Sequence, residues 1–442
     1  MSPDQIAAVI MMGLLLVMVI GGIHLAFALS FLSLAFGLIF QGPVVFSMSM
    51  LKIFGLMESE ILIAVPLFVF MGTILEKSEV AEGVYQSLYE LFGPIRGGLA
   101  FATVITCTIF ASCTGVIAAT VTTMTLLAVP SMLKRKYDKG LATGIVCAGG
   151  SLGILIPPSV MLVMYGPMAN LSVARLFAAA LFPGLLLALL YLFYIGIGSW
   201  LIPNLAPAIR EKERPIRGIR LWGKAAKQMI PPLFLIVAVL GSIIMGVASP
   251  TEAAGVGALC AMIIAAGYRK FSYATIKAAA YTTLIVTTMV FFIILGATIF
   301  NSIFLYLGGG ILIKSMLMSL PLGKWFVLFI MMFILFILGF FISWQGLLYV
   351  VVPIFLPVAA NLEFNPLWFG LLICLNLQMS FLTPPFAYAI FFVKGASPPE
   401  VKTWDIYRGV TPFVIIQAVA VFLCIVFPEI ILWMPRISLG YG

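Results

Sequence analysis

Hydroxyl-bearing and glycine residues gather in two stretches of the first half of this 442-residue chain. One stretch is ASCTG (Ala111–Gly115) and the other is GGSLG (Gly149–Gly153). Hydroxyl oxygens can surround a desolvated cation together with backbone carbonyls, which are freed where glycine lets segments approach closely. Close packing of helices on small residues is the alternative interpretation. The candidate residues for this cation site are Ser112, Cys113, Thr114, Gly115, Gly150 and Ser151.

A second polar group lies in the second half, in GFFISWQG (Gly339–Gly346) and QMSFLTPP (Gln378–Pro385). Trp344 has two open interpretations, because it could face a substrate or anchor the chain at the lipid interface, the commoner use of tryptophan. The candidate residues of this second group are Gly339, Ser343, Trp344, Gln345, Ser380 and Thr383.

Each half also interrupts an apolar run with paired prolines, Pro157 with Pro158 and Pro384 with Pro385. The two pairs lie 227 positions apart (384 minus 157). Proline lacks a backbone donor and clashes with the preceding turn, so a pair of them opens a helix. In lipid, such a break is tolerated where the freed carbonyls line a cavity or an ion site. Corresponding breaks in two halves therefore indicate the binding site of a transporter.

The composition requires these stretches to lie in a membrane. Hydrophobic residues make up 63% of the chain and charged residues 9%, and the mean hydropathy is +1.21. We therefore predict an all-α, polytopic membrane protein. The net charge of +9 is better explained by basic cytoplasmic loops than by nucleic-acid binding. His24 is the single histidine and the six cysteines form no CxxC pair, which argues against metal sites, disulfides and catalytic triads.

Basic clusters orient the segments. We place Lys134–Lys139, Arg210–Lys227, Arg269–Lys270 and the group Lys394, Lys402 and Arg408 in the cytoplasm. No lysine or arginine precedes Lys52, so we expect the N-terminus outside the cytoplasm.

Two stretches of roughly 34 residues, 97–130 and 325–358, are too long for one span and just long enough for two half-helices. We predict that each is a re-entrant hairpin followed by a Pro-Pro-broken helix, at 141–165 and 367–393. The halves, 1–203 and 229–442, then form an inverted-topology repeat joined by the basic cytoplasmic linker 204–228. Two ordinary crossings with a tight turn remain the alternative, since charge counting does not separate the two.

The acidic residues bear on the coupling ion. Almost all fifteen lie in loops or near segment ends, and none stands out at the middle of a span. Proton-driven transporters usually need a carboxylate or histidine deep in the membrane. The positions of the acidic residues therefore favour sodium over protons as the coupling ion. We expect no other cofactor. SPTE (Ser249–Glu252) is explained as a helix cap.

Five longer stretches together resemble the large membrane subunit of tripartite ATP-independent periplasmic (TRAP) transporters, over nearly the whole chain. They are FGPIRGGLA (Phe92–Ala100), the run from Lys136 to Gly166, LFAAALFPGLLL (Leu176–Leu187), SPTEAAGVGA (Ser249–Ala258) and LTPPFAYAIFF (Leu382–Phe392). The resemblance implies a sodium-driven elevator transporter in the bacterial inner membrane, with the N-terminus in the periplasm. It also implies a small four-helix membrane subunit, a soluble periplasmic binding protein and an organic-acid substrate, often a carboxylate.

The resemblance further implies two sodium sites, Ser112–Gly115 with Gly150–Ser151 and Gly339–Gln345 with Thr383. The chain departs from the family at His24, where a proline is usual, at Cys113, and at Ser343, Trp344 and Gln345, where an acidic motif is frequent. These departures bear on which side chains would bind sodium more than on where the two sodium sites lie.

Other functions remain as alternatives. A self-sufficient sodium/dicarboxylate symporter of related fold would need no binding protein. An intramembrane enzyme would need a positioned acid, histidine or serine pair inside the membrane, which the sequence does not offer. A channel would need a charged pore ring, and none is evident.

Overall fold

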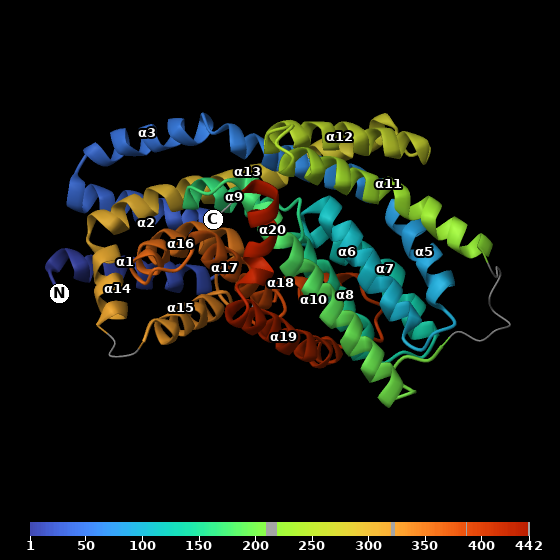
Figure 1. The fold of residues 1–442 in the computed structure, drawn as a ribbon. Helices are drawn as coiled ribbons and strands as arrows, with labels where there is room; N and C mark the ends of the chain where they lie inside the picture. The colour runs from blue at the N-terminus through green and yellow to red at the C-terminus, as the bar shows by residue number, and fades with distance from the viewer. Residues whose placement is uncertain (209–218, 320–322, 386, 441–442) are drawn as a thin grey trace.

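The computed structural model describes residues 1–208, 219–319, 323–385 and 387–440, and the residues of these ranges form helices and turns without strands (Figure 1). Eight helices within the described ranges are long and apolar enough to cross a membrane. The predicted all-α membrane fold is therefore confirmed. Part of the predicted basic loop, residues 209–218, lies outside the described residues.

The first half contains ten α-helices and two short 3₁₀ helices within its described residues. They are α1 (Pro3–Ile20), α2 (Leu25–Gln41), α3 (Val44–Met57), η1 (Glu60–Ile63), α4 (Ala64–Lys77), α5 (Val80–Phe92), α6 (Gly98–Thr114), α7 (Ile117–Lys134), α8 (Lys139–Ser151), η2 (Leu152–Ile154), α9 (Val160–Ala169) and α10 (Val173–Leu201).

The described part of the second half contains ten α-helices. They are α11 (Ile219–Ile244), α12 (Pro250–Gly267), α13 (Tyr273–Tyr306), α14 (Gly309–Met318), α15 (Lys324–Leu338), α16 (Trp344–Asn361), α17 (Pro366–Ser380), α18 (Tyr388–Ala396), α19 (Thr403–Val426) and α20 (Glu429–Leu439).

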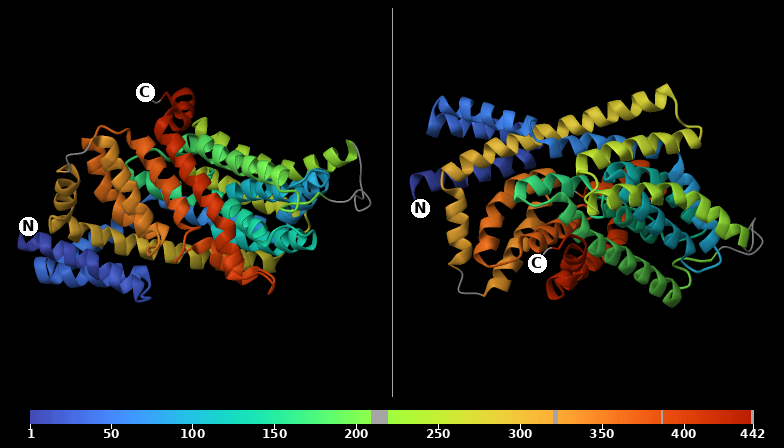
Figure 2. Two further views of the ribbon diagram at one scale, coloured as in Figure 1. Left: turned by 90° about the horizontal axis from the view of Figure 1, so that it is seen from below. Right: turned by 45° about the horizontal axis from the view of Figure 1, so that its top comes forward.

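The helices of the first half recur in the second. The starts of α6, α7, α8, α9 and α10 are followed 226 to 230 positions later by the starts of α15, α16, α17, α18 and α19. The two hairpins, α6 with α7 and α15 with α16, lie toward opposite ends of the molecule, and α13 runs along one side past both (Figures 1 and 2). This arrangement is the predicted repeat of a hairpin followed by a broken helix.

One pair of elements breaks the likeness between the halves. Helix α13 is a continuous helix of 34 residues, whereas α3 and the stretch η1–α4 meet at a bend of 60°. The polar run Glu58–Ser59–Glu60 interrupts the apolar sequence at this bend, and Ser59 has an extended backbone. The bend of the first half therefore coincides with this polar run, and the second half does not repeat it.

Each hairpin turns where the hydroxyl and glycine residues stand. Helix α6 ends at Thr114, and Gly115 takes a left-handed conformation (φ +59°) with its N–H bonded to the carbonyl of Ala111 at 3.0 Å. Glycine accepts this conformation without strain and ends the helix. In the second hairpin the turn spans Gly339–Ser343.

Both Pro-Pro pairs interrupt helices, as predicted, and both contain a cis peptide bond. Helices α8 and α9 flank Pro157 and Pro158, and α17 and α18 flank Pro384 and Pro385. The last apolar stretch of the chain is divided between α19 and α20. Pro428 disfavours helical backbone at Phe427 before it, which ends α19.

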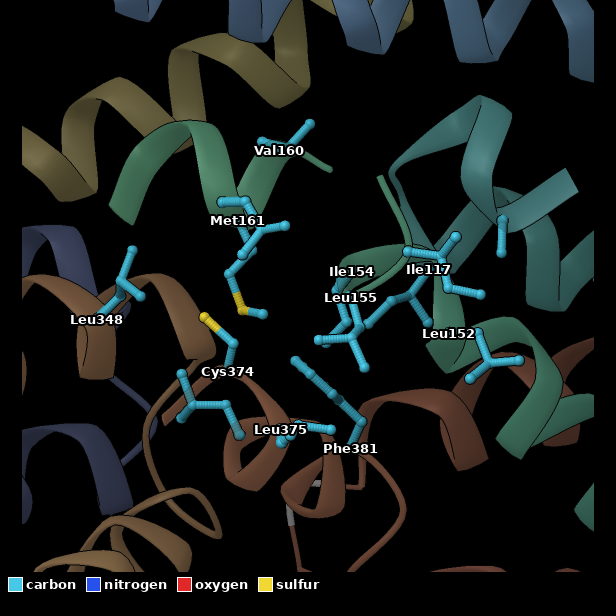
Figure 3. Close-up of a cluster of buried hydrophobic side chains, with 14 of the residues drawn as sticks. Ile117, Leu152, Ile154, Leu155, Val160, Met161, Leu348, Cys374, Leu375 and Phe381 are labelled. Carbon is cyan, nitrogen blue, oxygen red and sulfur yellow. The ribbon is translucent and has the colours of Figure 1, made fainter. Parts of the chain in front are cut away.

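The core lies where the two broken helices meet. Figure 3 shows apolar side chains from the first break, including Leu155 and Met161, pointing toward Cys374 and Leu375 of α17 and toward Phe381 beyond its end. All five are buried. The crossing of the breaks is therefore packed largely with apolar groups.

Candidate functional site

The turn of the first hairpin, which we call tip 1 (Ala111–Val116), is buried. The side chains of Ser112, Cys113 and Thr114 are at most 3% exposed. The hydroxyl of Ser112 donates to the carbonyl of Thr108 at 2.7 Å, and the hydroxyls of Thr114 and Thr120 lie 2.8 Å apart. A hydroxyl that donates its proton to a helix carbonyl keeps its lone pairs free to accept a cation or a donor.

Cys113 does not take part in this polar turn. Its thiol donates to the carbonyl of Pro232 in α11, with a sulfur–oxygen distance of 3.8 Å. The sulfur therefore contacts a neighbouring helix and joins the hairpin to α11.

The end of α8 lies close against the first hairpin through its glycines. A Cβ added to Gly150 would lie 2.3 Å from Cγ2 of Val121, and one added to Gly153 would lie 2.8 Å from the carbonyl oxygen of Ala111. Ser151 donates to the carbonyl of Ala148 at 2.8 Å. The predicted residues of tip 1 and of the first broken helix are thus neighbours.

The turn of the second hairpin, tip 2 (Gly339–Gln345), lines a cavity of about 350 Å³. A Cβ on Gly339 would lie 2.5 Å from Cβ of Ser380, so tip 2 touches the end of α17. The hydroxyl of Ser343 is buried without a hydrogen-bond partner, and Gln345, only 7% exposed, faces the cavity. Trp344 also lines it, which favours the cavity-facing interpretation of this side chain.

The opposite wall of this cavity comes from the turn between α1 and α2 and from α13, through Met289 and Ile293. His24 lies in that turn, and its Nδ1 accepts the N–H of Ala26 at 3.4 Å, which leaves Nε2 free. Helix N-termini carry partial positive charge. Two of them, those of α2 and α16, border the cavity beside His24 and Ser343.

Thr383 and Pro384 lie elsewhere. They line a different cavity, of about 950 Å³, with Asp138, Tyr194 and Arg408. The hydroxyl of Thr383 donates to the carbonyl of Met379 at 2.8 Å. The structure therefore brings Gly339, Ser343, Trp344, Gln345 and Ser380 together but leaves Thr383, Pro384 and Pro385 outside the cavity lining at tip 2.

A third cavity, of about 250 Å³, lies beside tip 1 and holds a residue that the sequence did not single out. Its walls include Glu76 of α4 and Thr114 of tip 1. Glu76 is one residue from the end of α4 and precedes Lys77, so in the sequence it resembles a solvated helix end. The threonines from other helices that line this cavity with Glu76 lie far from it in the sequence. Only the fold brings them close to Glu76, so the sequence gives no sign of the site.

Two hydrogen bonds join the halves. The amide nitrogen of Gln378 donates to the hydroxyl of Ser151 at 3.3 Å, and that of Gln417 donates to the hydroxyl of Tyr191 at 2.9 Å. Ser151 and Gln378 lie 227 positions apart, as the starts of α8 and α17 do, and so occupy equivalent positions. The broken helices α8 and α17 are thus linked by a polar contact as well as by their apolar crossing.

The donor set restricts which ions these sites could hold. In the part of the chain that the structure describes, no three His, Cys, Asp or Glu side chains gather as a metal ion would require. Hydroxyl and carbonyl oxygens in uncharged turns suit a monovalent cation better than a transition metal.

Comparison with known proteins places the chain among transport proteins. Residues 9–430 match the family model "Tripartite ATP-independent periplasmic transporter, DctM component". The C4-dicarboxylate TRAP transporter large permease protein DctM of Pseudomonas aeruginosa is 30% identical over 87% of this chain and 88% of its own length. The DctM protein of the same description from Vibrio cholerae is 29% identical over 97% and 98%.

A third relative, the ectoine/5-hydroxyectoine TRAP transporter large permease protein UehC of Ruegeria pomeroyi, is 29% identical over 84% of this chain and 85% of its own. Among solved structures, the Alcanivorax borkumensis YdaH transporter superposes with a TM-score of 0.64. That match covers 91% of this chain and 90% of the other at 14% identity, so it supports the fold.

Proposed function

This chain belongs to the DctM component family of tripartite ATP-independent periplasmic transporters, and from that premise we propose that it imports an organic acid by sodium-coupled elevator movement. It is a large permease subunit of a secondary transporter and a multi-pass membrane protein. The finer proposal concerns the substrate class, the coupling ion and the movement.

The observation that carries the proposal is the cavity at tip 2. Its walls come from two kinds of element, the hairpin with α17 on one side and α13 with the α1–α2 turn on the other. A substrate bound between a hairpin and long flanking helices can be carried when the hairpin moves against them. The helix N-termini and the amide of Gln345 supply donors suited to a carboxylate.

The coupling ion is proposed to be sodium, held at the two tips. Tip 1 offers buried hydroxyls of Ser112 and Thr114 with the carbonyls around Gly115, close to Gly150 and Ser151. Tip 2 offers Ser343, whose hydroxyl lacks a partner. Sodium at these turns would order them and so complete the substrate cavity, and the coupling between the two ligands would be reciprocal.

The moving unit is proposed to be α6–α9 with α15–α18. The Gln378–Ser151 hydrogen bond and the apolar crossing of the breaks hold the two halves of this unit together (Figure 3). The remaining long helices, such as α13, would serve as the scaffold. A small four-helix membrane subunit and a periplasmic binding protein would complete the transporter in the bacterial inner membrane, with the N-terminus in the periplasm.

The test is the thermal stability of the purified protein in detergent, with NaCl compared with KCl at equal ionic strength. A ligand at ten times its Kd stabilises by about 1.4 kcal/mol, so a saturable, sodium-specific rise in Tm is expected. The double variant Ser112→Ala/Thr114→Ala should raise the sodium midpoint. A folded wild-type protein with equal Tm in both salts would count against sodium coupling. Uptake that needs no binding protein would favour a self-sufficient symporter instead.

A further inference from the structure

The cavity beside tip 1 contains one carboxylate among hydroxyl groups. Glu76 is its single charged lining residue, and the other described polar side chains in its wall belong to threonines. These come from three places in the fold: α4 itself, the first hairpin, and α13. They are Thr73, Thr114, Thr122 and Thr282. An oxygen-lined space with one negative charge has the chemistry of a monovalent cation site.

The hydroxyls present lone pairs to this space. Thr73 donates its proton to the carbonyl of Val69 at 2.8 Å, within its own helix. The hydroxyls of Thr114 and Thr120 lie 2.8 Å apart, and either can donate to the other. Because these protons are engaged with protein oxygens, the remaining lone pairs of the two hydroxyls are available to a bound cation.

The cavity exists because α4 and tip 1 touch. A Cβ on Gly72 would lie 2.5 Å from Cα of Thr114, so α4 approaches the backbone of the tip at a distance that only glycine permits. Glu76 follows Gly72 by one helical turn and so lies on the same face of α4. The carboxylate and the tip hydroxyl therefore face one cavity only while tip 1 rests on α4.

No basic group in the described part of the cavity wall neutralises Glu76. Lys77 is adjacent in sequence but exposed. Beyond the end of α4, Lys270 pairs with Glu79 at 2.6 Å, and on α5 Glu82 is exposed. The residues that α13 and the hairpin contribute to the wall are uncharged, and Lys277 of α13 is exposed and outside the lining. Glu76 forms no ion pair within the described part of the chain, and the exposed Lys77 is the one basic group whose charge acts on it. A partly buried carboxylate in this position attracts a cation.

We propose that Glu76, together with Thr114 and Thr282, forms a monovalent cation site that takes sodium or a proton and that exists only while tip 1 is docked on α4. This site shares Thr114 with the sodium site proposed at tip 1, but its charged ligand, Glu76, and Thr282 lie outside that tip. A cation bound there would favour the docked position of the hairpin, and the hairpin's departure would release it.

The experiment measures the Tm of the full chain in detergent along two titrations. One varies NaCl at constant ionic strength and pH, and the other varies pH in sodium-free buffer. The variant is Glu76→Gln, which keeps the size of the side chain and removes its charge. Glu82→Gln is the matched control, because it removes an exposed carboxylate from the neighbouring helix α5.

If sodium is the ligand, Glu76→Gln should raise the sodium midpoint about tenfold or more, as expected for the loss of a charged partner, while Glu82→Gln keeps the wild-type midpoint. If a proton is the ligand, the wild-type Tm should depend on pH and Glu76→Gln should remove that dependence. Equal sodium midpoints and equal pH profiles for Glu76→Gln and the wild type would overturn the inference.

A second pair of variants guards against misfolding. Thr282→Val removes one hydroxyl from the cavity, whereas Thr288→Val removes one from the same helix outside it. Thr282→Val should raise the sodium midpoint or reduce the pH dependence of the Tm, as Glu76→Gln does, and Thr288→Val should change neither. The tip variant Ser112→Ala, outside this cavity lining, tests the proposed tip site separately, so the two proposals can fail independently.

Discussion

Gln345 shows what single residues contribute to the cavity at tip 2. It is almost fully buried and lines the cavity, and its side chain makes no hydrogen bond within the described part of the chain. The described lining contains no lysine or arginine, and His24 is its one side chain able to become a cation. Much of the remaining lining is apolar, including Leu25, Met289 and Phe381. Donors rather than full charges would therefore orient an acid here.

We therefore predict that Gln345→Leu raises the KM for uptake by about tenfold or more, because a donor to the bound carboxylate is lost at nearly constant volume. The sodium midpoint of the Tm should change less than this KM. Thr298→Val is the control, since its hydroxyl bonds to the carbonyl of Ile294 within α13 and lines no described cavity. Wild-type KM in reconstituted Gln345→Leu would remove this residue from the substrate site.

At the residue scale, residue types and their spacing predicted which polar side chains stand at the hairpin turns. Ser112, Thr114, Ser343 and Gln345 do stand at the hairpin turns. Glu76 was missed because a carboxylate next to a lysine at a helix end is normally solvated. Its cavity arises from three elements far apart in the sequence.

Glycine sets how closely the helices meet at the scale of elements. Helices α8 and α19 touch through their backbones, and a Cβ on Gly144 would lie 2.2 Å from the carbonyl oxygen of Gly409. A backbone oxygen within a helix cannot rotate away as a side chain can. This close contact with α19 fixes the position of α8, which is part of the first broken helix, and hence of tip 1 beside it.

Gly144→Ala is accordingly predicted to destabilise the protein by about 1–3 kcal/mol through overpacking. Gly255→Ala on α12 is the matched control, since a Cβ there meets nothing within 4 Å. It should be neutral or slightly stabilising because alanine favours the helix. Denaturation of both variants in detergent measures this, and equal stability of the two would contradict the proposed close contact.

The SPTE motif belongs to the same scale. Ser249 caps α12 in a capping box with Glu252, whose carboxylate accepts the N–H of Ser249 at 2.7 Å. Ser249→Ala should cost about 1 kcal/mol of stability. It should leave the sodium midpoint unchanged, since the motif lines none of the tip cavities. A shifted midpoint in a sodium titration would assign the motif a role beyond capping.

The sequence predicted the two Pro-Pro breaks and both hairpin turns, because proline and glycine act locally on the backbone. It did not predict the bend between α3 and α4 or the end of α19 at Phe427. It also did not predict that Thr383 lines a different cavity from the one at tip 2. The direction of a side chain next to a helix break depends on tertiary packing, which the sequence does not show.

At the scale of the whole molecule, one helix lies beside both hairpins. Helix α13 contributes Thr282 and Val286 to the cavity at tip 1 and Met289 and Ile293 to the cavity at tip 2. One helix therefore borders both the proposed ion region and the proposed substrate region. Movement of the hairpins relative to α13, as proposed above, would change both cavities together and so would couple the proposed ion to the proposed substrate.

The most direct test of sodium-coupled import is uptake into proteoliposomes that contain this chain with its small subunit. A binding protein loaded with its radiolabelled organic acid is supplied outside. We predict accumulation that requires an inward sodium gradient and that stops when the gradient is dissipated or sodium is replaced by potassium. Equal accumulation driven by a proton gradient in the absence of sodium would contradict sodium coupling.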